Sequence, residues 1–530
     1  MASETRTRHA RTYRRVFVGL SLALLALMLA VAPDFGATWD EPQQRAKALR
    51  LLAYLSAPNG VLHEPLDGAH LYGAPFDILA AALEPIVPAD PYVIRHEVIA
   101  VLGWLCLVTT GMLADRLFGP PHGVAALVLL AAWPTFFAHA MNNPKDTPFA
   151  AVATAILLTL AWTHARPPWT SWRIMLVLIG LIGLGLNVRP GALLFVGYVA
   201  AVAGYWLMAE LKFGPTYGRK ASTRDQWLRA GAWVLAILAG SIAIGWIFWP
   251  WAYQHPLVAP FKATIELGHF GWAGTVLFDG VSYPGRSLPA DYVARWFWLT
   301  LPPVIMVGLA ASVLLLRVPE RRDPALTLWG AIAFPVLFVV GTRATLYDGV
   351  RHLLFVFPPL VILAAAGWIA AWRSARPLLQ AAIAAAAAAG LIEPLAFHVR
   401  NHPNQTVYIQ PLAGGPAGAY ARYDLDYWGN CLLEGLSYVN ARDRGDRIVV
   451  SGWPLLVLEA DVSRFPRLVL ADRGDPRVTT FVTLARGTRE QLLALAANPG
   501  VDHRVTSADG AILCTVSSSD ARSPARTSRP

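Results

Sequence analysis

An acidic pair follows the first apolar run of the chain directly, in the sequence Thr-Trp-Asp-Glu-Pro at residues 38–42. Carboxylates are costly near the apolar part of a membrane, so their position favours a functional role for Asp40 and Glu41. A partly desolvated carboxylate with a raised pKa can take a proton from a hydroxyl group. The same residues also fit a plain helix start, because Asp40 with Gln43 resembles a capping box and Pro42 suits a first helical turn.

A second polar loop carries the sequence Asn-Asn-Pro-Lys-Asp-Thr-Pro at residues 142–148. Lys145 and Asp146 would bring a cation and a further carboxylate to the membrane level of Asp40. Asp146 or Thr147 could equally cap the helix that follows. The loop is therefore either part of a site or an ordinary helix start.

Basic residues recur on the same expected membrane face. Arg189 could bind a phosphate with two hydrogen bonds, or anchor the chain at the interface, which is the commoner role. Arg343 and Arg351 share one loop, where Asp348 could simply pair with either. Because cations are scarce on that face, several at one level favour an anion site. Other polar and aromatic candidates in these loops are His70, Tyr72, Tyr347, Asp348 and His352.

The composition sets the class of protein. Of 530 residues, 55% are hydrophobic and 15% are charged, whereas an average soluble domain carries roughly 25% charged residues. These values exclude an ordinary cytosolic enzyme, a disordered protein and a fibrous protein, and they predict an integral membrane protein. The net charge of +10 does not indicate a nucleic-acid partner, because no basic stretch is interleaved with aromatic residues.

Apolar runs of spanning length predict about eleven membrane spans. The shorter apolar segment 74–87 contains acids and is flanked by prolines, which favours a re-entrant or interfacial helix. The predicted spans lie at about 16–32, 94–114, 122–141, 147–163, 174–188, 191–209, 230–249, 296–316, 325–341, 353–372 and 377–397.

The distribution of Lys and Arg predicts the orientation. A cytoplasmic N-terminus puts the short basic loops inside, as the positive-inside rule requires. An odd number of spans then places everything after residue 398 outside the cytoplasm. We therefore expect a multi-pass protein of the inner (plasma) membrane, with its candidate site residues on the extracytoplasmic face and with membrane lipids around it.

The predicted domains follow from these spans. A basic cytoplasmic N-terminus (1–15) precedes a membrane domain (16–397), whose outer loops are 33–93 and 250–295. Strand-like runs at 447–452 and 478–484, with a helical stretch at 488–497, predict a small extracytoplasmic α/β domain over 398–516. Residues 517–530 are rich in Ser, Arg and Pro, which is typical of a disordered tail.

Cysteine usage is sparse. Three cysteines are too few for a disulfide framework. Cys106 lies in an apolar run, which favours simple packing. Cys431 and Cys514 lie in the polar C-terminal part and could pair if that part is extracytoplasmic.

The polar motifs together resemble the GT-C superfamily of membrane glycosyltransferases. They are most similar to bacterial members of glycosyltransferase family 39, akin to protein O-mannosyltransferases and the lipid A aminoarabinose transferase. The resemblance covers residues 10–400 and extends into 402–429. Its matching segments are Trp39–Pro42, Asn143–Asp146, Asn187–Pro190, Tyr347–His352 and Phe355–Pro359.

The resemblance implies a sugar donor linked to polyprenyl phosphate and an inverting transfer to a hydroxyl on an extracytoplasmic glycan, lipid or protein. It implies that Asp40 is the base, with Glu41 as its neighbour, and that Asp146 helps to organise the site. Candidates for the donor phosphate are Lys145, Arg189, Arg343 and Arg351. No obligatory metal is expected, although a divalent cation is left open.

One segment departs from the family pattern. Aminoarabinose-type enzymes carry a basic residue before a proline late in the first loop, where this chain reads His-Leu-Tyr-Gly-Ala-Pro at residues 70–75. The departure leaves the donor contacts and the sugar open. His63, Glu64 and His70 are further candidates there, although loop histidines are more often simply solvated.

Two other classes of function compete with the transferase. A transporter or flippase of lipid-linked glycans would need polar groups at mid-depth within the spans, and few are present. A non-catalytic assembly protein with an outer domain for cell-wall components would tolerate loss of both Asp40 and Asp146. The clustering of polar groups at one membrane face favours an active site at the water boundary.

Overall fold

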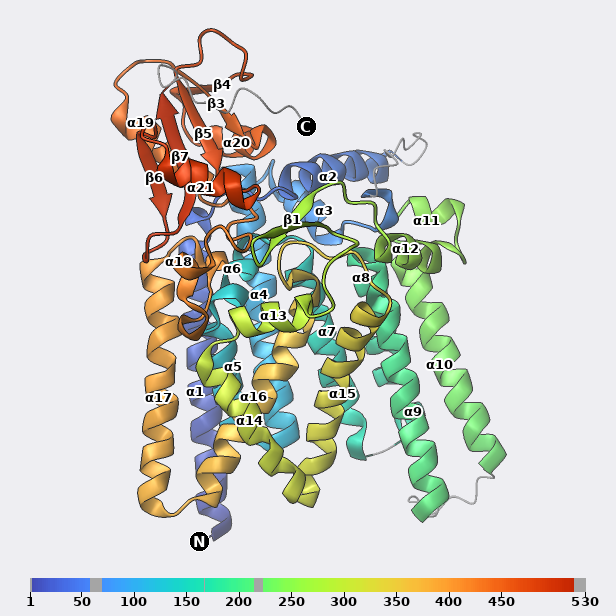
Figure 1. The fold of residues 1–530 in the computed structure, drawn as a ribbon. Coiled ribbons are helices and arrows are strands. Elements are labelled where there is room, and N and C mark those ends of the chain that lie inside the picture. Colours follow the sequence, from blue (N-terminus) through green and yellow to red (C-terminus); the bar gives the residue numbers. More distant parts are fainter. Residues whose placement is uncertain (1, 58–68, 166, 214–222, 519–530) are drawn as a thin grey trace.

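The structure, a computed structural model, describes residues 2–57, 69–165, 167–213 and 223–518. Its helices form an upright bundle, and a five-stranded sheet lies at the end of the bundle opposite the N-terminus (Figure 1). We call this end of the bundle the sheet end. His63, Glu64 and residues 519–530 of the predicted tail lie outside the described residues.

Apolar helices make up the bundle, so the protein is a multi-pass membrane protein. Within the described ranges, seven segments are long and apolar enough to cross a membrane. The main helices of these segments are α1 (Ala2–Val31), α4 (Pro91–Phe118), α9 (Leu193–Phe213), α10 (Thr223–Gly245), α15 (Pro319–Gly341), α16 (Phe357–Ser374) and α17 (Pro377–Arg400).

Two further predicted spans are broken. The helices α5 (Pro120–Ala131) and α6 (Pro134–Asn142) meet at 73°, and α13 (Tyr292–Thr300) meets α14 (Pro303–Ala311) and the turn after it at 111°. Proline follows each break, where it can begin a helix but not continue one. Counting each bent pair once gives up to nine spans among the described residues.

The predicted count of eleven spans is not confirmed. The segments expected at 147–163 and 174–188 form α7 (Asp146–Ala161) and α8 (Trp172–Val188), which have 16 and 17 residues. These helices are apolar but shorter than a full span. Both lie within the bundle (Figure 1), and α7 begins at Asp146.

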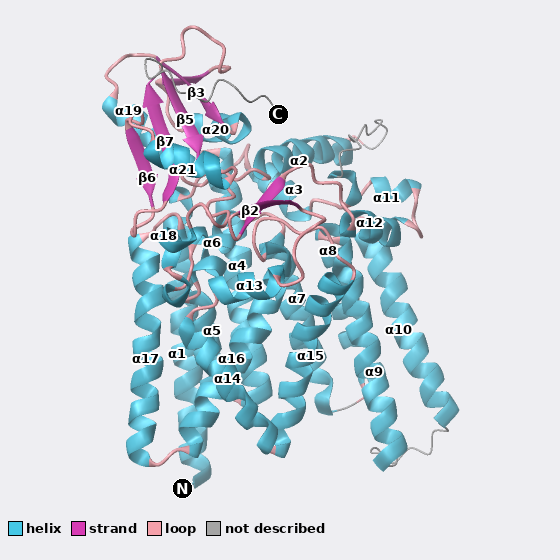
Figure 2. Ribbon diagram, viewed as in Figure 1, coloured by secondary structure: helices cyan, strands magenta, loops and turns pink. Residues whose placement is uncertain are grey.

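Short elements cover the sheet end of the bundle. The first outer segment forms α2 (Glu41–Ser56) and α3 (Pro75–Leu83), the latter where an interfacial helix was predicted. The segment 250–295 forms α11 (Trp251–Gln254), α12 (Ala259–Gly268) and the hairpin of β1 (Thr275–Phe278) with β2 (Val281–Pro284). Figure 2 shows the strands confined to this end.

The C-terminal region is a mixed sheet with helices. Its strand order is β4-β3-β5-β7-β6, with β3 parallel to both β4 and β5. The strands are β3 (Ile448–Trp453), β4 (Leu468–Leu470), β5 (Thr480–Leu484), β6 (His503–Thr506) and β7 (Ile512–Ser518). The helices are α18 (Gly415–Ala419), α19 (Leu432–Arg442), α20 (Leu455–Val462) and α21 (Arg489–Ala497).

The predicted C-terminal elements are confirmed as β3, β5 and α21. Thr488 and Gln491 form a capping box at the start of α21, as a Thr-x-x-Gln spacing favours. The predicted tail begins two residues too early, because Ser517 and Ser518 pair with Phe481 and Thr480 in the sheet. Pairing with β5 satisfies their backbone groups, which composition alone does not reveal.

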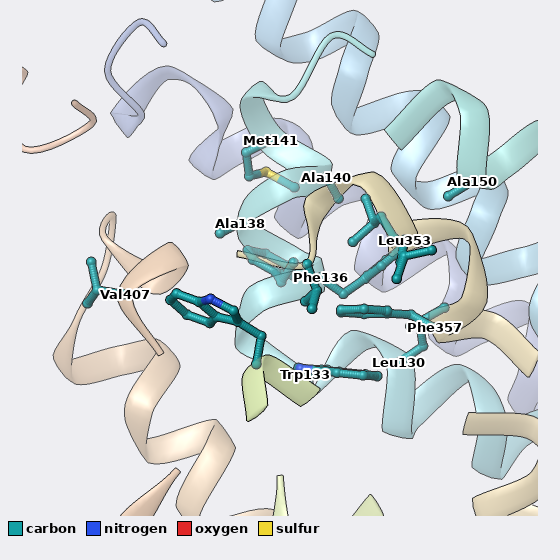
Figure 3. Packing of buried hydrophobic residues seen from close by; sticks show 14 of the residues in the cluster. Leu130, Trp133, Phe136, Ala138, Ala140, Met141, Ala150, Leu353, Phe357 and Val407 are labelled. Atoms are coloured by element: carbon teal, nitrogen blue, oxygen red, sulfur yellow. The ribbon is translucent and has the colours of Figure 1, made fainter. Parts of the chain in front are cut away.

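An aromatic core fixes the broken helices beneath the sheet end. Trp133, at the break between α5 and α6, stacks on Phe357 at 3.8 Å between ring centroids (Figure 3). Its indole N–H donates to the Thr300 carbonyl at the end of α13 over 2.7 Å. Phe357 is the first residue of α16. Trp133 therefore links the α5–α6 break and the α13–α14 break to the segment that carries Arg351. Buried residues from the bundle and from the sheet belong to one continuous cluster.

The turn before the acidic pair is clamped by the C-terminal region. The backbone N–H of Gly36 donates to Asn430, and that of Ala37 donates to Asp461, each over 2.9 Å. Asn142 donates to both the Gly36 carbonyl and the Asn430 side chain. A Cβ at position 36 would lie 2.6 Å from the Asn430 carbonyl oxygen, so this close approach requires glycine.

Cys431 and Cys514 form a disulfide between the start of α19 and β7, at a sequence separation of 83. Such a link restricts the unfolded chain, so Cys431→Ser should lower the free energy of unfolding of this region by about 2–4 kcal/mol. Thermal unfolding with and without reductant measures the effect. Cys106→Ala is the control, because Cys106 is not bridged and this variant should keep its sensitivity to reductant. Equal stability of the oxidised and reduced wild type would contradict the expectation.

Candidate active site

A cavity of about 1110 Å³ opens between the sheet end of the bundle and the C-terminal sheet. It is lined by the starts of α2 and α7, by the 345–352 loop, by the 267–275 segment and by the ends of β3 and β5. Segments distant in the sequence therefore meet here. Eight predicted site residues line the cavity: Asp40, Tyr72, Lys145, Arg189, Tyr347, Asp348, Arg351 and His352.

Asp40 lies between two cations on the cavity wall. Its Oδ2 is 3.6 Å from Lys145 Nζ and 3.3 Å from Arg351 Nη1, and 23% of its side chain is exposed. It precedes α2 but makes no capping hydrogen bond to that helix, so the capping interpretation is wrong. Burial alone would raise the pKa of Asp40, but the charges of Lys145 and Arg351 outweigh burial and lower it.

Glu41 points away from the cavity and holds the turn that carries Asp40. It is fully buried, and its Oε2 accepts hydrogen bonds from the Thr38 N–H and hydroxyl at 2.8 and 3.1 Å. Its Oε1 lies 3.1 Å from His96 Nε2 on α4. A carboxylate with these contacts fixes the backbone of the loop and does not reach a ligand in the cavity.

Asp146 lies behind the cavity wall and orients its arginines. Its side chain is 2% exposed, forms an ion pair with Arg189, and lies 3.5 Å from Arg351 Nη1. Asn143 donates to Asp146 Oδ2 over 2.9 Å and accepts the backbone N–H of Asp146. Neither Asp146 nor Thr147 caps α7, so the capping interpretation is wrong here also.

Arg351 is the hub of the charged cluster. Its guanidinium contacts three carboxylates, those of Asp40, Asp146 and Asp348, at 3.3 to 3.5 Å. It lies 4.7 Å from the ring centres of both Tyr347 and Trp428. Only 2% of the side chain is exposed, so Arg351 chiefly positions the carboxylates. Lys145 and Arg189 reach the cavity further, with 16% and 25% exposed.

Tyr72 lies between two lysines beside Asp40. Lys145 and Lys47 lie 4.9 and 4.2 Å from its ring centre, and Lys47 donates to its backbone carbonyl. Burial alone would raise the pKa of the Tyr72 hydroxyl, but the two lysines outweigh it and lower the pKa. Burial alone would lower the pKa of Lys145, but Asp40 and Tyr72 raise it, so Lys145 stays a cation.

The C-terminal region contributes residues that the sequence did not single out. Arg486, just after β5, contacts Asp348 Oδ1 at 2.8 Å and lies 3.9 Å from Asp424. Burial raises the pKa of Asp424 to about 6, although Arg486 opposes the shift. Trp453 and Arg473 line the cavity from the same side. No sequence motif marks these residues, because they reach the site through the folding of the sheet.

Besides Glu41 and Asp146, two predicted residues fall outside the cavity lining. Arg343 is exposed and lies at a left-handed backbone position before the loop turns inward. His70 is buried, its carbonyl accepts the indole N–H of Trp249, and its ring packs edge-on to Trp251. His352 does line the cavity, beside the ring of Tyr347 at 4.8 Å between centroids.

No metal site coincides with the cavity in the described part of the chain. There, the group close enough to share an ion consists of Asp426, Cys431 and Cys514. These residues do not line the cavity, and the two cysteines are joined in the disulfide. The carboxylates of the cavity are instead paired with Lys145, Arg351 and Arg486. That no metal is obligatory for catalysis stays a prediction.

We compared the chain with protein-family models, curated proteins and solved structures. No protein-family model matches the chain, and no curated protein matches its sequence. ArnT from Cupriavidus metallidurans, solved bound to undecaprenyl phosphate, matches 97% of this chain and 100% of its own with a TM-score of 0.50 and 14% identity. The fold is GT-C.

Two other solved structures give weaker matches. The oligosaccharyltransferase AglB from Archaeoglobus fulgidus, in complex with an inhibitory peptide and a dolichol-phosphate, has a TM-score of 0.47 and 13% identity over 88% of this chain and 69% of its own. The S. cerevisiae protein O-mannosyltransferase Pmt1-Pmt2 complex, bound to its sugar donor, has a TM-score of 0.35 and 16% identity over 46% and 34%. The shared fold is shown by the match to ArnT, which covers nearly the whole of both chains.

Proposed function

We propose that the protein is a membrane glycosyltransferase that moves a sugar from a polyprenyl-phosphate donor to a hydroxyl group. The observation that carries the proposal is a carboxylate, Asp40, placed between Lys145 and Arg351 in a large cavity of a GT-C fold. Sugar transfer of this kind needs a base for the acceptor hydroxyl and, beside it, positively charged side chains that bind the donor phosphate. The general base and the leaving-group site then lie within one cavity.

In the proposed reaction, the acceptor oxygen attacks the anomeric carbon while Asp40 takes its proton. The bond from that carbon to the phosphate oxygen breaks, and polyprenyl phosphate leaves as a monoester. A single in-line displacement inverts the configuration at the anomeric carbon. Lys145 and Arg189 stabilise the negative charge of the leaving group, since cations fixed where charge develops cost no reorganisation. Arg351 and Asp146 hold the arrangement.

The proposed orientation puts the cavity outside the cytoplasm of a cell bounded by an inner membrane. The N-terminus lies at the opposite end of the bundle from the cavity, and the short basic loops favour a cytoplasmic position for that end. An oxidised Cys431–Cys514 bridge in protein taken from intact cells is the expected sign of this orientation, because disulfides persist outside the cytosol. Reduced thiols there would contradict it.

Incubation of the purified full-length protein with a panel of polyprenyl-phosphate sugars tests the function. We expect at least one donor to release its lipid phosphate in a manner that depends on time and on enzyme. Donor binding without release from any member of the panel would contradict the proposal. Parallel reactions with EDTA and with added divalent cations test whether a metal is needed.

The pH dependence should differ between the free enzyme and the donor complex. In the free protein the two cations keep the pKa of Asp40 below its ordinary value of 3.8, so kcat/KM should stay flat down to that region. A bound donor phosphate offsets the charges of Lys145 and Arg351, so the pKa of Asp40 should rise in the complex. The acidic limb of kcat should therefore lie at higher pH than that of kcat/KM. Coincident limbs in initial-rate profiles would contradict this electrostatic account.

A further inference from the structure

The roof of the cavity is formed by one edge of the C-terminal sheet. The strands β4, β3 and β5 are mutually parallel neighbours, so their carboxyl ends lie at the same edge. Trp453 ends β3, Leu484 ends β5, and Arg473 follows β4, and all three line the cavity. The carboxyl edge of parallel strands is where open α/β sheets bind ligands. The roof therefore has the topology of a binding site in its own right.

Aromatic rings face this space from both sides. Trp453 and Trp39 pack edge to face at 5.5 Å between centroids, and Trp272 stacks on Tyr347 at 4.5 Å. All four rings line the cavity. Each indole is only partly buried, which leaves apolar ring area for a ligand. Trp39 directly precedes Asp40, so a ligand against this ring lies next to the proposed base.

Uncharged hydrogen-bonding groups lie beside these rings. Thr483 on β5, Gln491 on α21 and Gln43 on α2 all line the same cavity. Arg486 is engaged by Asp348 and Asp424 and is not a free cation. Flat apolar rings next to neutral donors and acceptors match a sugar ring, which has C–H faces and hydroxyl edges.

We propose that the roof is a saccharide-binding subsite and that the acceptor of the transfer is therefore a glycan. The inference rests on the proposed function and narrows it, because it selects one acceptor class from glycan, lipid and protein. The sugar ring lies against Trp453 and Trp39, and one of its hydroxyls meets Asp40. A bound acyl chain would offer the Gln43 and Thr483 side chains no hydrogen-bond partner.

Binding is tested apart from turnover. The full-length protein in nanodiscs is mixed with gluco-, manno- and galacto-oligosaccharides of two to four residues, and saturation-transfer difference NMR detects contact. We expect a signal from at least one oligosaccharide, a loss of about tenfold or more in affinity for Trp453→Ala, and a smaller loss for Trp453→Phe, which keeps a ring. Trp298→Ala is the matched control, because Trp298 is 42% exposed and does not line the cavity.

The same variants are also assayed for sugar transfer to an acceptor and for donor cleavage by water. Trp453→Ala should raise the KM for a saccharide acceptor about tenfold or more, whereas Trp298→Ala should leave both that KM and donor cleavage by water unchanged. No saccharide binding, or transfer to peptide or lipid hydroxyls at a rate indifferent to Trp453→Ala, would overturn the saccharide subsite alone. Saccharide binding that depends on Trp453, without cleavage of any donor, would overturn the proposed transferase function alone.

Discussion

Replacement of Asp40 by asparagine is expected to reduce the turnover of sugar transfer by about 10² to 10⁴-fold, the usual contribution of a general base. Asparagine has the same shape but cannot accept the proton of the attacking hydroxyl. The substitution also removes a negative charge beside Lys145 and Arg351, which leaves these cations freer for the donor phosphate. The KM for the donor should therefore stay the same or fall while kcat falls.

Initial rates over a range of donor concentrations separate these two effects. Asp34→Asn is the matched control, because Asp34 lies in the same connection, is 54% exposed, pairs with His402 and does not line the cavity. This control should transfer sugar normally. A wild-type kcat in Asp40→Asn would show that Asp40 is not the general base. A rise in the donor KM alone would instead assign Asp40 to donor binding.

Replacement of Arg351 by methionine is expected to give the largest loss of stability at the site. The guanidinium contacts three carboxylates and is almost wholly buried, so its removal leaves Asp40, Asp146 and Asp348 repelling one another. Breaking a buried ionic cluster in this way costs about 3–5 kcal/mol. The change should lower the midpoint of thermal unfolding and abolish transfer.

Two variants control this experiment. Arg343→Met removes an exposed arginine of the same loop and should change the free energy of unfolding by no more than about 0.5 kcal/mol. Arg351→Lys keeps the charge but loses the flat fork that reaches several carboxylates, so its stability should lie between wild type and Arg351→Met. An Arg351→Met protein as stable as wild type would mean that the carboxylates find other partners.

Much of the fold could be predicted from hydropathy and turn chemistry. Apolar runs marked the long helices, and the runs at 447–452, 478–484 and 488–497 marked β3, β5 and α21. The same patterns could not separate full spans from shorter or broken ones. Whether a run such as 147–163 crosses a membrane depends on packing and helix breaks, and α7 ends after 16 residues.

Only part of the site could be predicted, because local sequence patterns do not reveal how distant segments pack. Asp40, Lys145 and Arg189 were marked by polar residues in short loops beside apolar runs, and they line the cavity. Glu41 shares the motif with Asp40 but faces the opposite way, because adjacent residues at a helix start point in different directions. Arg486 and Trp453 carry no local signal.

The sequence by itself determined a membrane protein with a few charged groups at one face, because isolated charges among apolar residues are visible in composition and order. It did not determine which of these groups meet. Only the tertiary structure placed Arg351 among three carboxylates, turned Glu41 toward His96, and brought the carboxyl edge of the C-terminal sheet over Asp40. Several of those contacts join distant segments, since Asp40 and Arg351 are 311 positions apart and Glu41 and His96 are 55 apart. They depend on how helices and sheet pack, and no local pattern in the chain encodes that packing.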